Sequence, residues 1–161
     1  MHGTADGLCR ITNQNAEVVS QSDIIVIAVK PAVVSVVLEE IKASLTAEQL
    51  QSKCFISIAA GVSIDALQSK LTPGVSFIRV MPNTPCSVGE CAAAYSLGTH
   101  STQEHQKKCE AIFNSVGTVC QVSESIMDGV TGLSGSGPAC ECTAFEAILS
   151  FTLSDYAFFV L

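Results

Sequence analysis

The chain has 161 residues, of which 48% are hydrophobic and 14% are charged, and its formal net charge is -7 at pH 7. This length and this share of hydrophobic residues predict a globular protein with one sizeable core and part of a second, rather than a disordered chain. The negative charge argues against a nucleic-acid partner, because phosphate binding requires clustered basic side chains.

Nothing in the sequence suggests a membrane span or a signal peptide. Hydrophobic runs of eighteen or more residues are absent, and residues 1–10 contain no hydrophobic run flanked by basic residues. Residues 148–161 form the most hydrophobic stretch, but Asp155 interrupts it and it is too short to cross a bilayer. We therefore expect no membrane partner.

The eight cysteines form no CxxC pair, and the three histidines stand at no ligand spacing from them. Several of the cysteines lie inside hydrophobic segments, where a reduced thiol packs as a small hydrophobic side chain. The pattern predicts free thiols, no structural disulfide and no metal site. It favours a cytoplasmic location, with a mitochondrial location as the alternative.

Three short runs dominate the first half of the chain, at residues 24–29, 54–59 and 75–80. Their nearly continuous hydrophobic and β-branched character is typical of strands buried on both faces of a parallel sheet. Residues 33–45 repeat hydrophobic side chains at helical spacing and predict a crossover helix, and Ser63 predicts the N-cap of a second helix. This βαβ order predicts a doubly wound, mostly parallel α/β sheet.

The second half of the chain continues this alternation and then changes. Residues 92–97 and 118–122 predict two further strands, and residues 102–114 predict a surface helix between them. Residues 128–138 are rich in glycine and predict a tight turn that opens a helix at Pro138. We therefore expect a change of architecture near residue 128.

Ligands of open parallel sheets bind outside the carboxyl ends of the strands, which directs attention to residues 28–31, 59–62 and 81–85. Small residues there allow a ligand to approach the backbone, while Lys30, Asn83 and Thr84 offer a charge and hydrogen-bonding groups. Each segment also has a purely structural explanation: Pro31 starts a helix, Gly61 forms a turn, and prolines stiffen the loop around Asn83. Three such segments at one edge favour a site.

The glycine-rich segment at residues 132–138 fits no phosphate or nucleophile motif. A dinucleotide GxGxxG turn must follow a strand and end in glycine, and a GxSxG elbow needs a glycine where Ser136 stands.

Four blocks together resemble the pyrroline-5-carboxylate reductases in order and spacing: AVKP at residues 28–31, SIAAGV at 57–62, MPNTP at 81–85 and VTGLSGSGPA at 130–139. The resemblance implies a Rossmann-like NAD(P)-binding domain followed by an α-helical dimerisation domain. It also implies reduction of 1-pyrroline-5-carboxylate to L-proline with NADPH, or alternatively NADH, by a homo-oligomer.

The resemblance also implies roles for individual residues. Lys30 is the candidate catalytic residue, and Glu124 matches a position near the bound imino acid, although a solvated carboxylate at a helix start explains Glu124 equally well. The cofactor-contacting positions are Asn15, Ala28, Val29, Lys30, Pro31, Ile58, Ala59 and Ala60, with Asn83 and Thr84 at the nicotinamide end.

Two departures from the family pattern suggest a fragment. The glycine-rich turn that seats the pyrophosphate would precede residue 1, and the family's SSPGGTT-like substrate loop has no counterpart. We expect a partial NAD(P)-binding domain at residues 1–127, the start of a helical dimerisation domain at 128–147 and a divergent tail at 148–161. The alternatives are a non-catalytic isoform that associates with a full-length reductase, or a dehydrogenase of 2-hydroxy or keto acids.

Overall fold

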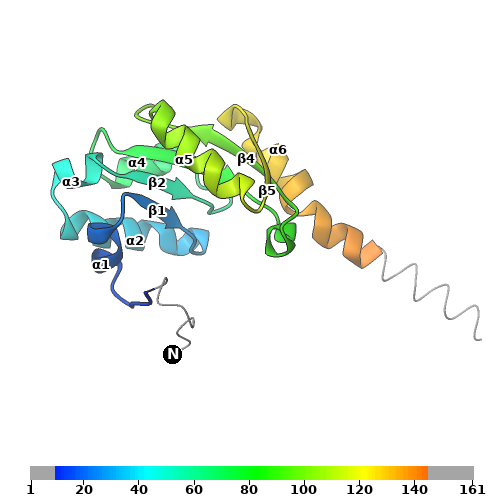
Figure 1. Cartoon of the computed structure of the whole chain (residues 1–161), viewed down its shortest axis with the longest axis horizontal. Helices are drawn as coiled ribbons and strands as arrows, with labels where there is room; N and C mark the ends of the chain where they lie inside the picture. The colour runs from blue at the N-terminus through cyan, green and yellow to red at the C-terminus, as the bar shows by residue number, and fades with distance from the viewer. Residues whose placement is uncertain (1–9, 145–161) are drawn as a thin grey trace, which may run out of the picture. The chain divides into compact units, whose positions relative to one another are not determined.

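The computed structural model describes residues 10–144 of the chain. Strands and helices alternate along it, which confirms the predicted α/β class (Figure 1). The helices are α1 (Asn15–Gln21), α2 (Pro31–Ser44), α3 (Ala47–Gln51), α4 (Ile64–Lys70), α5 (Gln103–Asn114) and α6 (Met127–Val130). The strands are β1 (Ile24–Ile27), β2 (Cys54–Ser57), β3 (Ser76–Met81), β4 (Cys91–Leu97) and β5 (Gly117–Gln121). Three short helical turns complete the set: η1 (Thr84–Val88), η2 (Glu124–Ile126) and η3 (Thr131–Gly135).

These elements form two compact units. The first comprises residues 10–80 and 97–109, and the second comprises residues 81–96 and 110–144. The predicted domain boundary near residue 128 stays a prediction.

In the first unit, β1, β2 and β3 lie side by side and run parallel, as predicted. Ile25 is paired with Phe55, and Phe55 with Phe77, so their side chains stack across the strands. The rings of Phe55 and Phe77 lie 5.4 Å apart between centroids, and both side chains are fully buried. Burial on both faces explains the nearly continuous hydrophobic runs of β2 and β3.

The strands end earlier or later than the hydrophobic runs predicted. β1 stops at Ile27 and β2 at Ser57, whereas β3 continues to Met81. The N–H of Ile58 still donates to the carbonyl of Ile27 over 3.1 Å, after which the chain turns toward the next helix. The strands therefore exclude Ala28, Val29 and Ala59, although these residues are as hydrophobic as the strand residues that precede them.

Two of the helices of this unit follow the predicted pattern. α2 buries Val34, Leu38 and Ile41 on one face. α4 begins after Ser63, whose hydroxyl accepts a hydrogen bond from the N–H of Ala66 over 3.2 Å, which confirms the predicted N-cap.

The helices α1 and α3 are not evident from the sequence pattern, because seven and five residues are too short to show a helical period. α3 is held instead by a capping box, in which Thr46 and Gln49 each accept a hydrogen bond from the other's backbone N–H.

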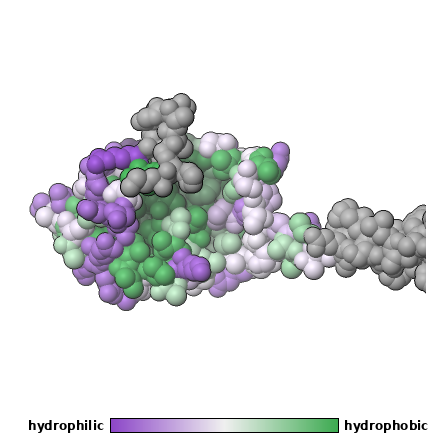
Figure 2. Space-filling view, turned by 90° about the horizontal axis from the view of Figure 1, so that it is seen from below, coloured by the Kyte–Doolittle hydropathy of each residue, from purple (hydrophilic) through white to green (hydrophobic). Residues whose placement is uncertain are grey.

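Hydrophobic side chains remain exposed on α1, β1 and α2. Figure 2, which views the molecule from the side on which α1 and α2 lie in Figure 1, shows hydrophobic residues gathered there. Val18, Val26, Val33 and Val36 of these elements are each more than two-fifths exposed. Val26 belongs to a strand, so this part of β1 is covered on fewer sides than β2, whose four residues are all buried.

In the second unit, β4 and β5 run parallel with Cys91 opposite Gly117, which confirms both predicted strands within one residue. The backbones approach closely at this pair: a Cβ atom added to Gly117 would lie 2.1 Å from the carbonyl oxygen of Cys91. Tyr95 in the middle of β4 is fully buried and donates its hydroxyl hydrogen bond to the carboxylate of Glu110.

The predicted tight turn in the glycine-rich segment is wrong. Residues 127–135 are helical, because the N–H of Ser136 donates to the carbonyl of Thr131 and the Thr131 hydroxyl donates to the carbonyl of Met127. Residues 137–144 are helical as well, which agrees with the predicted helix, and residues 145–147 lie outside the described part.

The expectation of no disulfide is also wrong. Cys86 and Cys91 are bonded to each other in the second unit. Residue spacing carries little signal for this bond, because the turn η1, closed by Gly89 in the left-handed region (φ 78°), brings together two cysteines that share no recognised motif. Within residues 10–144, no helix has the length and hydrophobic character needed to cross a bilayer.

Candidate functional site

Lys30 and the segment after β2 lie at one edge of the first unit. β1 and β2 are adjacent and parallel, so the residues that follow their carboxyl ends emerge at the same edge. Lys30 is exposed, caps α2 just before Pro31, and makes no side-chain hydrogen bond or ion pair with the described residues. Ala60 and Gly61 form the turn after β2, and the φ of 72° at Gly61 explains its glycine.

Three of the predicted cofactor residues line one cleft. Asn15, Ala28 and Val29 surround it together with hydrophobic side chains of α1, β1 and α2, among them Val18 and Val37. Its volume is about 100 Å³, compared with roughly 300–1,000 Å³ for a typical small-molecule pocket. The cleft is therefore large enough for only a part of a dinucleotide.

Asn15 is held in this cleft by α2. Its side-chain Nδ2 donates a hydrogen bond of 2.9 Å to a carboxylate oxygen of Glu40. The interaction uses one amide hydrogen, so the second hydrogen and the carbonyl oxygen of the side chain have no partner among residues 10–144. The residue can both donate to and accept from a ligand.

The remaining predicted residues of the first unit differ in accessibility. Ala60 and Pro31 are exposed and Ile58 is half-buried, whereas Ala59 is only 4% exposed and its N–H faces the hydroxyl of Ser57 at 3.4 Å. Ala59 can thus support the loop but offers a ligand little surface of its own.

Asn83 and Thr84 belong to the second unit, on the loop after β3. The Oδ1 atom of Asn83 accepts a hydrogen bond of 3.0 Å from the N–H of Ala92. Thr84 starts η1 with an exposed side chain, and its carbonyl accepts a 3.0 Å hydrogen bond from the hydroxyl of Ser87. The loop therefore presents Thr84 while it uses the carbonyl oxygen of Asn83 for its own structure.

Glu124, the predicted substrate residue, also lies in the second unit. It is half-buried and begins η2 directly after Ser123. A carboxylate at this position suits the first turn of a helix, so Glu124 has a structural explanation as well as the predicted role in substrate binding.

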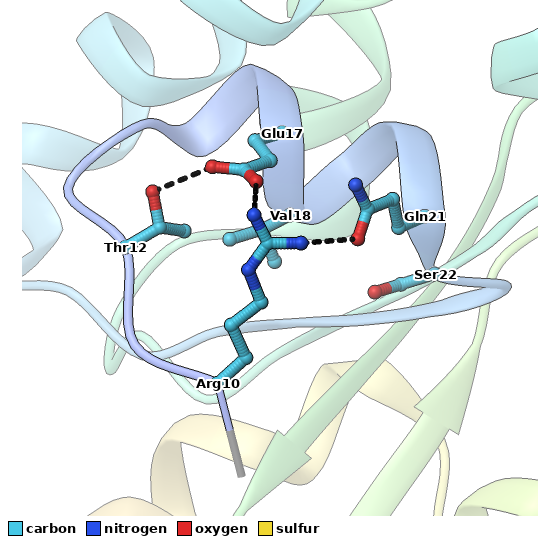
Figure 3. Close-up of a pocket in the computed structure, with 6 residues that line it drawn as sticks. All are labelled: Arg10, Thr12, Glu17, Val18, Gln21 and Ser22. Carbon is cyan, nitrogen blue, oxygen red and sulfur yellow. Dashed lines mark hydrogen bonds and ion pairs between the residues drawn. The ribbon is translucent and has the colours of Figure 1, made fainter. Parts of the chain in front are cut away.

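A polar cluster ahead of α1 was missed by sequence reasoning. Figure 3 shows the guanidinium of Arg10 between Glu17, with which it forms an ion pair, and Gln21, which it reaches at 3.3 Å. The hydroxyl of Thr12 donates to the same carboxylate over 2.8 Å. Because Glu17 already balances the charge of Arg10, the cluster fixes the approach to α1 and leaves no free charge for an anionic ligand.

Neither metal chemistry nor a thiol nucleophile emerges from the described residues of the first unit. Residues 10–144 contain no group of three or more metal-ligating side chains. Cys54 is buried in β2, and burial raises the pKa of its thiol, although hydrogen bonding to Ser76 and the charge of Lys108 oppose the shift. A thiol that stays protonated is a poor nucleophile.

The parallel sheet with ligand-accessible residues after its strands defines the class of this chain: a Rossmann-like α/β domain of the kind that binds nucleotides. Residues 4–61 match the family described as "NADP oxidoreductase coenzyme F420-dependent".

The more specific relatives are pyrroline-5-carboxylate reductases, which confirms the resemblance seen in the sequence. The enzyme from Methanosarcina acetivorans is 45% identical over 86% of this chain and 50% of its own length, and that from Arabidopsis thaliana is 41% identical over 86% and 48%. The crystal structure of the Plasmodium falciparum enzyme with NADP bound superposes with a TM-score of 0.83 at 35% identity, covering 89% of this chain and 53% of that one. The chain spans about half the length of the curated relatives it matches.

Proposed function

We propose that this chain supplies the nicotinamide-side part of an NADPH site, in a protein that reduces 1-pyrroline-5-carboxylate to L-proline. The observation that carries the proposal is the common edge of β1 and β2, where exposed Lys30 and the turn at Gly61 emerge together. The relatives named as pyrroline-5-carboxylate reductases supply the substrate class.

The residues of the first unit fit a part of the cofactor. Asn15 offers a donor and an acceptor beside Ala28 and Val29, whose small or hydrophobic side chains suit a flat ring or a ribose. NADPH, when bound, supplies the hydride that adds to the C=N carbon. The protein contributes positioning, and the cation of Lys30 can hold an anionic group of a ligand near this edge.

The chain alone should bind NADPH weakly and form no proline. The cleft of about 100 Å³ holds only part of a dinucleotide. Each charge-assisted hydrogen bond that the rest of the cofactor does not make with this chain costs roughly 1.5–3 kcal/mol of binding free energy. Titration of NADPH by fluorescence measures this affinity. Micromolar binding with turnover would contradict the assignment of only a partial cofactor site to this chain.

A chimera tests the function itself. Residues 15–144 of this chain would replace the aligned segment of the Methanosarcina acetivorans reductase, and NADPH-dependent proline formation would be assayed. We expect activity, and we expect Lys30→Ala to raise the KM for NADPH or lower kcat by roughly tenfold or more. Lys42→Ala, in the last turn of the same helix, is the matched control. A folded chimera that binds NADPH without reducing the imino acid would overturn the substrate assignment.

The remaining proposals concern the complete protein. By its relation to the reductases we infer a homo-oligomer, with the helical residues 127–144 as the start of a dimerisation domain. Five cysteines of the described part form no disulfide, which supports a reducing compartment, cytoplasmic or mitochondrial.

A further inference from the structure

The disulfide between Cys86 and Cys91 lies in the loop between β3 and β4, which also carries two of the candidate ligand residues. Only Pro85 separates Thr84 from Cys86, and the disulfide joins the middle of η1 to the first residue of β4. Cys91 is five positions after Cys86, so the bond encloses only residues 87–90 around Gly89.

Little else holds this loop. None of the residues of η1 is buried, and Val88 is 74% exposed. The hydrogen bonds that hold it include those from Gly89 to the carbonyl of Cys86 (3.3 Å) and from Glu90 to that of Pro85 (3.1 Å), and that from Ala92 to the side chain of Asn83. A segment with few buried contacts opens readily, so a covalent link has a large effect on it.

The other cysteines of the described part form no disulfide. Cys54 and Cys109 are buried, while Cys120, Cys140 and Cys142 are exposed without forming a bond. A single disulfide among several cysteines that form none is typical of reversible, redox-sensing pairs rather than of the disulfide frameworks of secreted proteins.

The two sulfurs also differ in accessibility. Cys86 is half-buried beside the exposed residues 87–90, whereas Cys91 is 2% exposed. Thiol–disulfide exchange requires access for the attacking thiolate, so exchange must begin at Cys86.

We propose that Cys86 and Cys91 are a reversible thiol–disulfide pair, and that their reduction frees the loop that carries Asn83 and Thr84. The oxidant is a low-molecular-weight disulfide such as oxidised glutathione. The thiolate of Cys86, having lost its proton, attacks one glutathione sulfur, which forms a mixed disulfide and expels one glutathione thiolate. The thiolate of Cys91 then attacks the sulfur of Cys86, which closes the protein disulfide and expels the second glutathione. Two protein thiols are oxidised and one glutathione disulfide is reduced to two thiols.

The first experiment equilibrates the chain in glutathione buffers of graded redox ratio and follows alkylation of each cysteine by mass spectrometry. As the buffer becomes more oxidising, we expect Cys86 and Cys91 to become protected together without a glutathione adduct, whereas Cys120, on β5 of the same unit, is protected only when it carries a glutathione adduct. A mixed glutathione adduct should accumulate on Cys86 in Cys91→Ser. The proposal would be overturned if Cys86 and Cys91 were not protected together at any ratio. It would also be overturned if the adduct formed on Cys91 in Cys86→Ser but not on Cys86 in Cys91→Ser.

The second experiment measures amide hydrogen exchange at Glu90 and Ala92 in the oxidised and the reduced chain. Reduction should accelerate this exchange roughly tenfold or more, because the loop regains the freedom that the cross-link removes. Cys86→Ser should match the reduced chain under both conditions, while Cys120→Ser should behave as the unmodified chain. Equal exchange in the two states would show that the disulfide does not fasten the loop. Any change in NADPH affinity rests on the function proposed above, whereas alkylation and exchange do not, so the two ideas can fail separately.

Discussion

The side-chain carbonyl oxygen of Asn83 accepts a hydrogen bond from the backbone N–H of Ala92, at 3.0 Å. The bond joins the candidate ligand loop after β3 to the beginning of β4, nine residues later in the chain. One side chain thus links the shape of the loop to the strand that follows it.

Replacement of Asn83 by alanine should destabilise this loop. Removing the acceptor should lower the free energy of unfolding by about 0.5–1.5 kcal/mol and should increase amide exchange at Ala92. Asn83→Asp keeps an oxygen at the same place and is the matched control. Urea unfolding and hydrogen exchange provide the two measurements, and an Asp variant as disturbed as the Ala variant would argue that the acceptor is unimportant.

Gly117→Ala should be far more damaging than its size suggests. The new Cβ atom would lie 2.1 Å from the carbonyl oxygen and 2.4 Å from the nitrogen of Cys91, so the two backbones would have to separate. We expect a loss of about 3 kcal/mol or more of the free energy of unfolding. Gly129→Ala, where a Cβ meets nothing within 4 Å in a helix, should be stabilising by roughly 0.5–1 kcal/mol. Similar unfolding curves for the two variants would contradict this account.

Acid should weaken the start of α5 through His105. Burial lowers the pKa of this imidazole below its ordinary value of 6.5, the charge of Lys108 lowers it further, and Glu104 opposes the shift. The Nδ1 atom of His105 faces the N–H of Thr102 at 3.4 Å, and a protonated ring cannot accept that hydrogen bond.

The sign of the pH effect follows from the lowered pKa of His105. Protonation favours the unfolded chain, so the stabilisation is complete above the ordinary pKa and is lost as the pH falls through the folded value. Proton NMR titration of His105 and unfolding curves between about pH 7.5 and pH 5 measure the effect. His105→Gln retains an acceptor and should remove this part of the pH dependence. An unchanged slope in that variant would assign the effect to other groups.

Tyr95→Phe should cost more than an ordinary surface substitution. The Tyr95 side chain is 1% exposed, and its hydroxyl donates to the carboxylate of Glu110. Loss of a hydrogen bond to a charged group, with the hydrophobic ring retained, should lower the free energy of unfolding by roughly 1.5–3 kcal/mol. Glu110→Gln keeps an acceptor and should cost less. Urea unfolding of both variants tests the order, and a neutral Tyr95→Phe would rule out this stabilising role.

The sequence by itself determined the order and type of most elements. Continuous hydrophobic runs predicted β1, β2 and β3, and a period of three to four predicted α2. β2 and β3 are covered on both faces and need no polar side, whereas β1 leaves Val26 exposed. The rule that ligands bind after the carboxyl ends of parallel strands also predicted that Lys30 and Gly61 lie at one edge of the sheet. These signals are local, so neighbouring residues suffice to reveal them.

Only the tertiary structure decided which distant groups meet. Asn15 shares a cleft with Val29 because α1 packs beside β1 and α2, and Cys86 meets Cys91 because η1 turns back onto β4. Position 117 must be glycine because a Cβ atom there would clash with the backbone of Cys91. Cys91 lies 26 residues earlier in the chain, and nothing in the sequence around it indicates this contact. Such relationships depend on how separate segments are brought together in space, and residue type or spacing along one segment does not encode them.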